Sequence, residues 1–97
     1  MLNPTAPERL VDALGRPTFL WDCDITLGEL KARLADADVD IASYWLGTLM
    51  RQARPDDALT LASSAQMRAL WPYLERYLGK ERPFWIWYLA ELEKRGK

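Results

Sequence analysis

Histidine is absent from this chain of 97 residues, and cysteine occurs once, as Cys23. A single thiol cannot close an internal disulfide, and without histidine it leaves no nitrogen and sulfur cluster for zinc or another transition metal. The lack of histidine also removes the side chain most often used for proton transfer near neutral pH, so acid–base chemistry would depend on carboxylates, lysine, tyrosine or the cysteine. We therefore expect no cofactor and no metal site.

A basic excess and a long hydrophobic run are also missing. Thirteen Lys and Arg residues against fourteen Asp and Glu residues give a net charge of −1, whereas proteins that bind a phosphate backbone usually carry a basic surplus. No apolar run approaches the roughly 18 residues of a membrane-spanning helix. Residues 1–4 show neither a basic nor a hydrophobic leader pattern. The sequence thus predicts a cytoplasmic protein that binds neither nucleic acid directly nor a membrane.

Large apolar side chains, in contrast, are plentiful. Apolar residues make up 49% of the chain, and five residues are tryptophans, which suits a short domain that needs a dense core. Helix-breaking residues recur about every 10 to 18 residues, as expected for short packed helices. We expect a single all-α domain over residues 1–97, with five or six short helices and an extended connector near residues 16–25.

Capping residues and apolar stripes set the expected helix boundaries. Thr5 with Glu8, and Thr26 with Glu29, have the capping-box spacing. The predicted helices cover about residues 6–14, 27–35 and 40–53, a short segment from Pro55, a segment from Ser63 to the stop at Gly79, and a last segment from about Pro83 to Arg95. The predicted core consists of apolar residues on the inward faces of these helices: Leu10, Leu14, Leu30, Leu34, Trp45, Leu49, Leu70, Trp71, Leu74, Tyr88 and Leu89.

An apolar run followed by Asp22-Cys23-Asp24-Ile25-Thr26 contains the pattern D-x-D-x-T, which resembles the nucleophile motif of haloacid-dehalogenase-like phosphatases. That resemblance implies a small phosphohydrolase with Asp22 as nucleophile and Asp24 as general acid–base. Such enzymes need a parallel α/β sheet, and this sequence has no second strand-like run. Hydrogen bonds to loop amides or to the helix start are the simpler role for both aspartates. We expect the protein not to be an enzyme.

Aromatic and turn residues recur in a set of short segments: 16–26, Tyr44-Trp45-Leu46, 53–57, 69–74 and 85–88. In these segments the chain is similar to a family of short helical bacterial proteins whose genes typically precede that of a nucleotidyltransferase-like toxin of the abortive-infection type. The resemblance implies an antitoxin, a protein-binding module that neutralises the toxin by direct complex formation. No basic recognition helix is recognisable, which argues against operator binding. A structural helical subunit that only oligomerises is a further alternative.

Acidic residues concentrate between positions 22 and 40, where six acids face two bases and leave a balance of −4. An acidic lobe of this kind would complement the positive pocket of an enzyme that binds nucleotide phosphates or transfer RNA. The simpler explanation is that caps and loops favour Asp and that the acidic face is solvated.

Helical geometry separates Trp87 from the core side of the last helix. At about 100° per residue, Trp85 and Leu89 share one sector, together with Tyr88 and Leu92, whereas Trp87 falls on the opposite side. It either packs against the connector at residues 19–21 or faces a partner, because exposed tryptophan is enriched at interface hot spots. The candidate partner-binding residues are Trp21, Asp22, Asp24 and Trp87.

Replacing both aspartates, Asp22→Asn with Asp24→Asn, tests the enzymatic alternative. We expect the variant to fold, and we expect the wild-type protein to release no phosphate from phosphate esters, because no sheet positions the two carboxylates for catalysis. A phosphate-release assay with added divalent metal measures both. Metal-dependent turnover by the wild type that the double variant loses would establish the phosphohydrolase instead.

Overall fold

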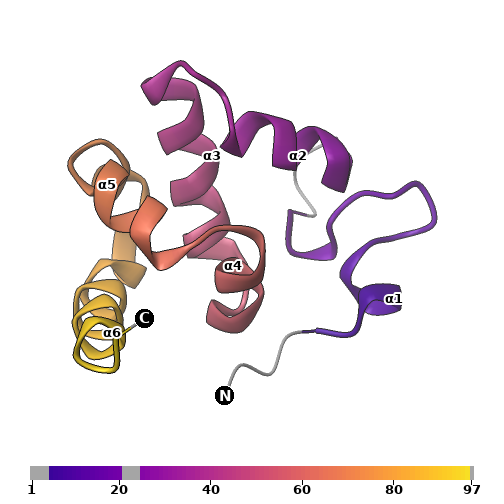
Figure 1. Ribbon diagram of the computed structural model, residues 1–97. Coiled ribbons are helices and arrows are strands. Elements are labelled where there is room, and N and C mark those ends of the chain that lie inside the picture. The colour runs from indigo at the N-terminus through magenta and orange to yellow at the C-terminus, as the bar shows by residue number, and fades with distance from the viewer. Residues whose placement is uncertain (1–4, 21–24, 97) are drawn as a thin grey trace.

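The computed structural model describes residues 5–20 and 25–96 (Figure 1). Within these ranges the backbone forms helices, turns and one isolated antiparallel bridge between Val11 and Pro17, so the predicted all-α class is confirmed. The α-helices are α1 (Pro7–Leu10), α2 (Leu27–Leu34), α3 (Val39–Gln52), α4 (Pro55–Leu61), α5 (Ser64–Leu74) and α6 (Arg82–Lys94). Short 3-10 turns are η1 (Thr18–Leu20), η2 (Glu75–Tyr77) and η3 (Gly79–Glu81).

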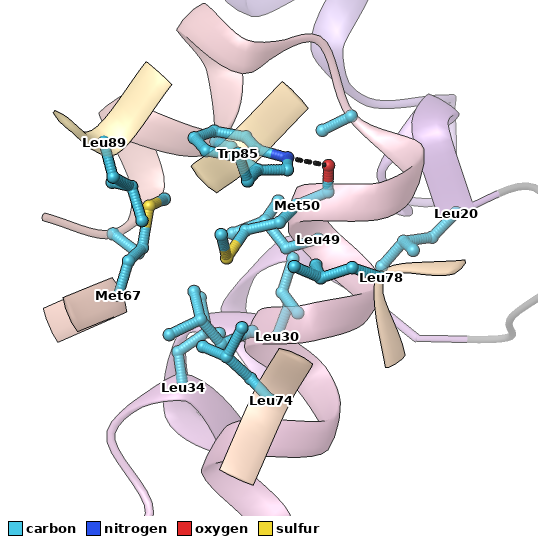
Figure 2. Close-up of a cluster of buried hydrophobic side chains, with 14 of the residues drawn as sticks. Leu20, Leu30, Leu34, Leu49, Met50, Met67, Leu74, Leu78, Trp85 and Leu89 are labelled. Atoms are coloured by element: carbon cyan, nitrogen blue, oxygen red, sulfur yellow. Dashed lines mark hydrogen bonds between the residues drawn. The ribbon is translucent and has the colours of Figure 1, made fainter. Parts of the chain in front are cut away.

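Helix α3 is central, with α2 and α5 packed against it and α6 beside α5 at the edge of the molecule (Figure 1). Its apolar residues face both neighbours, which is why the sequence shows a wide apolar sector over this helix. Figure 2 shows the core, to which the packed helices contribute Leu30, Leu34, Leu49, Met50, Met67, Leu74, Trp85 and Leu89. Of the predicted core, Trp45, Leu70, Trp71 and Tyr88 are half-buried against this cluster rather than inside it.

The capping box predicted for α2 is present. Thr26 Oγ1 accepts a hydrogen bond from the Glu29 amide at 3.1 Å, and Glu29 Oε1 accepts one from the Thr26 amide at 3.0 Å. That second bond, from the Thr26 backbone, lowers the pKa of Glu29 below its ordinary value. Ser63 caps α5 as predicted, but the Gln66 side chain donates to the Leu34 carbonyl at 2.9 Å. The cap residues of α5 therefore also tie it to the end of α2.

The prediction for the first helix is wrong in length and in its cap. Helix α1 ends at Leu10, and Ala6 precedes it without a side-chain cap. Thr5 instead donates from its amide and hydroxyl to the Asp57 carboxylate, at 2.6 and 2.5 Å. Asp12 then closes a turn, because its carbonyl accepts from the Gly15 amide at 3.0 Å. Leu14 lies on that turn and is 69% exposed, so its assignment to the core is also wrong.

The Asp12 turn is held by the carboxylate as well as by the backbone. Asp12 Oδ1 accepts hydrogen bonds from the Leu14 and Arg16 amides, at 2.9 and 3.0 Å. The bond from the Arg16 amide holds the pKa of Asp12 below its ordinary value. Gly15 has the left-handed φ of +78° expected for a chain reversal. The turn, rather than a helix C-terminus, therefore uses this glycine.

Helix α5 ends earlier than predicted, at Leu74 rather than near Gly79. The chain then continues through η2 and η3, which bring Tyr77 against Gly47 in the middle of α3. A Cβ added at Gly47 would lie 2.8 Å from Tyr77 Cβ and 3.1 Å from the Leu74 carbonyl oxygen. The absence of a side chain at position 47 is what lets the end of α5 approach α3 this closely.

Gly47→Ala is therefore expected to lower the free energy of unfolding by about 1 kcal/mol, because overpacking costs about 1–3 kcal/mol and outweighs the roughly 1 kcal/mol gained in helix propensity. Gly28→Ala is the matched control. Gly28 is also helical, but it is exposed and has nothing closer to its added Cβ than Thr26 Oγ1 at 4.0 Å. The control should gain about 0.5 kcal/mol in urea unfolding. Equal stabilisation of both variants would refute the close approach.

Candidate protein-binding surface on helix α6

One buried tryptophan fixes how α6 lies on the domain. Trp85 is 1% exposed, and its indole Nε1 donates to the Met50 carbonyl at 2.8 Å (Figure 2). Met50 lies in the last turn of α3, where carbonyls lack a partner within the helix. Leu89 and Leu92 are buried on the same side of α6. The predicted inward sector is thus confirmed, and it sets which side of the helix faces out.

Two consecutive turns of α6, residues 84–90, carry no charge on any side. Their polar side-chain groups are the Tyr88 hydroxyl and the indole N–H groups of Trp85 and Trp87. A helix that is apolar all round is normally buried all round, yet here the side opposite Trp85 is open. Ile86 is 46% exposed and Trp87 58% exposed, and Ala90 is also exposed. We call these three residues the α6 face.

Trp87 is held in place although it is exposed. Its ring lies nearly parallel to that of Tyr88, with centroids 6.0 Å apart and an interplanar angle of 17°, and it also contacts Phe84 at 6.1 Å. Phe84 and Tyr88 are themselves packed against the core. Trp87 is 58% exposed, so the structure shows its ring in a solvent-facing position. The ring is therefore presented on a rigid aromatic support.

An open groove of about 370 Å³ runs beside the α6 face. Arg68 and Trp71 of α5 form one wall, and the α6 residues along it are Ile86, Leu89, Ala90 and Glu93. Arg68 Nη2 donates to the Leu89 carbonyl at 3.1 Å, which links the two helices across the groove. We call this feature the α5–α6 groove. Its lining is mainly apolar, and its size suits one or two large side chains from another molecule.

The charges beside this surface include Arg68 in the α5 wall of the groove, and Glu91, Glu93 and Lys94 near the end of α6. Lys94 Nζ pairs with Glu91 Oε1 at 3.3 Å on the solvent side, and an exposed pair of this kind contributes little to stability. Glu93 is exposed at the rim of the groove. The remaining residues of the α6 face and the groove are apolar or aromatic, namely Trp71, Ile86, Trp87, Leu89 and Ala90. An apolar centre with a polar edge is typical of protein interfaces.

The other sequence-predicted partner residues, Trp21, Asp22 and Asp24, lie outside the described residues. The structure therefore tests neither their proximity to Trp87 nor their role. Sequence reasoning missed the groove and the exposure of Ile86, although the uninterrupted apolar run at 84–90 was a visible signal for both. Across residues 5–20 and 25–96, no group of three or more metal-ligating side chains is found, and no helix is long and apolar enough to cross a membrane.

Comparison with models of protein families, with curated proteins and with solved structures found no match to this chain. The features that indicate a function are therefore the geometry of the α6 surface and the residue pattern of the chain.

Trp85 and Trp87 provide a matched pair of tests on one helix. Trp85→Phe removes the donor to the buried Met50 carbonyl and leaves a gap, so it should cost about 2–4 kcal/mol of unfolding free energy. Trp87→Phe keeps an aromatic ring in the open and should change stability by no more than about 0.5 kcal/mol. Chemical denaturation of both variants measures the difference. A large loss for Trp87→Phe would place that ring in the core.

Proposed function

We propose that this protein is an antitoxin-like binding module and that the α6 face, with the α5–α6 groove, is where its toxin partner docks. The observation that carries the proposal is an exposed tryptophan, Trp87, supported by Phe84 and Tyr88 beside an open apolar groove. Exposed apolar surface of this kind is a mark of protein interfaces. A tryptophan on a rigid support also loses little conformational freedom when it binds.

The nature of the partner comes from the residue pattern rather than from the surface. We take the partner from the resemblance of the aromatic and turn segments to those of antitoxin-like proteins encoded beside nucleotidyltransferase-like toxins. The proposed partner is such a toxin, and the chemistry would reside in that enzyme. The acidic segment supports this choice, because Asp36, Asp38 and Asp40 are exposed and would complement a positive nucleotide pocket. Trp21, Asp22 and Asp24 belong to the same proposed contact region. The proposal also places both proteins in the cytoplasm of a bacterium.

Direct occlusion is the form of neutralisation that this proposal adopts. A rigid apolar anchor at the groove would hold the complex, and the acidic segment would repel the anionic substrate from the toxin's pocket. Anchor residues of this type typically contribute 2 kcal/mol or more when truncated, whereas rim charges mainly change the rate of association. Neutralisation should therefore depend far more on Trp87 than on any single aspartate.

Trp87→Ala should weaken binding to the neighbouring toxin by about 2 kcal/mol, which corresponds to roughly thirtyfold in Kd, with thermal stability little changed. Tyr73→Ala is the matched control, because Tyr73 is 48% exposed but lies on α5 outside the lining of the groove. Calorimetric titration gives Kd, and growth of cells that coexpress the toxin gives neutralisation. Soluble wild-type protein that neither binds nor rescues would overturn the proposal, and equal losses for both variants would move the interface away from α6.

A further inference from the structure

A second aromatic surface, in which Tyr44 is exposed and Trp45 and Tyr77 are half-buried, crosses the first half of α3. Tyr44 meets Trp45 and Tyr77 edge to face, each with ring centroids 5.3 Å apart. An arginine lies over each end of this row: Arg33 stands 5.5 Å from the centre of Trp45, and Arg76 stands 5.0 Å from the centre of Tyr77. Tyrosine, tryptophan and arginine are the residues most enriched at interface hot spots.

Tyr77 and Tyr44 hold defined positions in this row. Tyr77 Cβ approaches the backbone of α3 at Gly47, so the turn that carries it has little room to move. Tyr44 is 44% exposed and lies edge-on against the Tyr77 ring. The two rings form a preformed ridge rather than a pair of loose side chains.

Opposite charges flank this ridge. Asp40 precedes Tyr44 by one helical turn, so the two side chains are neighbours on the surface of α3. Arg76 lies on the other side, over Tyr77. Both charged residues are exposed, and within the described part of the chain neither forms an ion pair. The order along the surface is therefore acid, tyrosine, tyrosine, arginine, which we call the tyrosine face.

We propose that the tyrosine face is an interface between two copies of this chain. A two-fold axis through the ridge would place Asp40 of each copy against Arg76 of the other and would stack the tyrosines between them. Such an arrangement is self-complementary, as a two-fold interface requires. Val39 and Ile41, 40% and 38% exposed, add apolar area beside Asp40.

A second copy suits this face better than an unrelated acidic or basic partner. A strongly acidic partner would be attracted to the arginines but repelled by Asp36, Asp38 and Asp40. A basic partner would be attracted to these aspartates but repelled by the arginines. A stable dimer buries about 800 Å² per subunit, which is roughly an eighth of the 6039 Å² surface of this chain. The ridge with its flanking charges and exposed aliphatic residues is a compact region from which that area can come.

The tyrosine face is separate from the α6 face. Tyr44 lies in the first half of α3, whereas α6 contacts α3 through Met50 in its last turn. The dimer therefore does not depend on the proposed antitoxin function, and it would leave one α6 face open on each subunit. Asp40 belongs both to the tyrosine face and to the acidic segment proposed to face the toxin, so the two failures are told apart with Arg76→Glu, which changes the tyrosine face alone, and Trp87→Ala, which changes the α6 face alone.

Sedimentation equilibrium of the full chain, at concentrations up to about 1 mM, tests the dimer. We expect reversible dimerisation that weakens when salt rises from about 0.1 M to about 1 M, because exposed charge pairs are screened. Asp40→Lys and Arg76→Glu should each raise the dissociation constant about tenfold or more, since each places two like-charged contacts across the axis. Far-UV circular dichroism checks that both variants remain folded.

Mixing the two variants is the decisive step. In a mixed dimer, Lys at position 40 of one chain meets Glu at position 76 of the other, and the native Asp40 meets the native Arg76. Association should therefore return to within about threefold of the wild type only in the mixture or in the doubly substituted chain. A wild type that stays monomeric throughout would overturn the proposal. So would self-association that survives both charge reversals but is lost in Ile86→Asp, because the second copy would then lie on α6.

Discussion

The contact between Trp85 and Met50 is the constraint on which the outer half of the domain depends. A buried indole must place its N–H on an acceptor, and the end of α3 offers carbonyls that the helix itself leaves unpaired. The hydrogen bond of 2.8 Å from Trp85 Nε1 to the Met50 carbonyl satisfies both groups and fixes the rotation of α6 about its axis. Once that rotation is fixed, the uncharged stretch of α6 at residues 84–90 has to present part of its apolar surface to solvent. The exposure of Trp87 is thus a consequence of the burial of Trp85.

Much of this architecture can be predicted from the sequence because it follows from local rules. The capping box at Thr26 and Glu29, the start of α5 at Ser63 and the inward sector of α6 each depend on residues three or four positions apart, and the structure confirms them. The predicted cap of the first helix is wrong because the hydrogen bonds of Thr5 go to a distant residue. Thr5 has the capping-box spacing to Glu8, but its amide and hydroxyl donate to the Asp57 carboxylate, 52 positions away.

The candidate surfaces could be predicted to a smaller extent, because they depend on how separate helices are placed relative to one another. A helical wheel places Trp87 outside without knowledge of the rest of the chain. The α5–α6 groove and the row from Arg33 to Arg76 need the relative placement of separate helices, which a single sequence does not provide. Gly47 illustrates the difference. The sequence shows only a glycine within a predicted helix, whereas the role of this glycine depends on Tyr77, which the short turn η2 places against it.

The hydrogen bonds from Thr5 to Asp57 connect two segments that lie 52 positions apart in the chain. Helix α1 is a single turn, and a single turn of helix is not stable by itself in water. Asp57 is buried at 4% exposure, and a buried carboxylate needs hydrogen-bond donors to remain in place. Each end therefore supplies what the other lacks. The same two hydrogen bonds therefore hold the N-terminal segment against α4 and satisfy the buried acid of that helix, so loss of the Asp57 carboxylate would affect both.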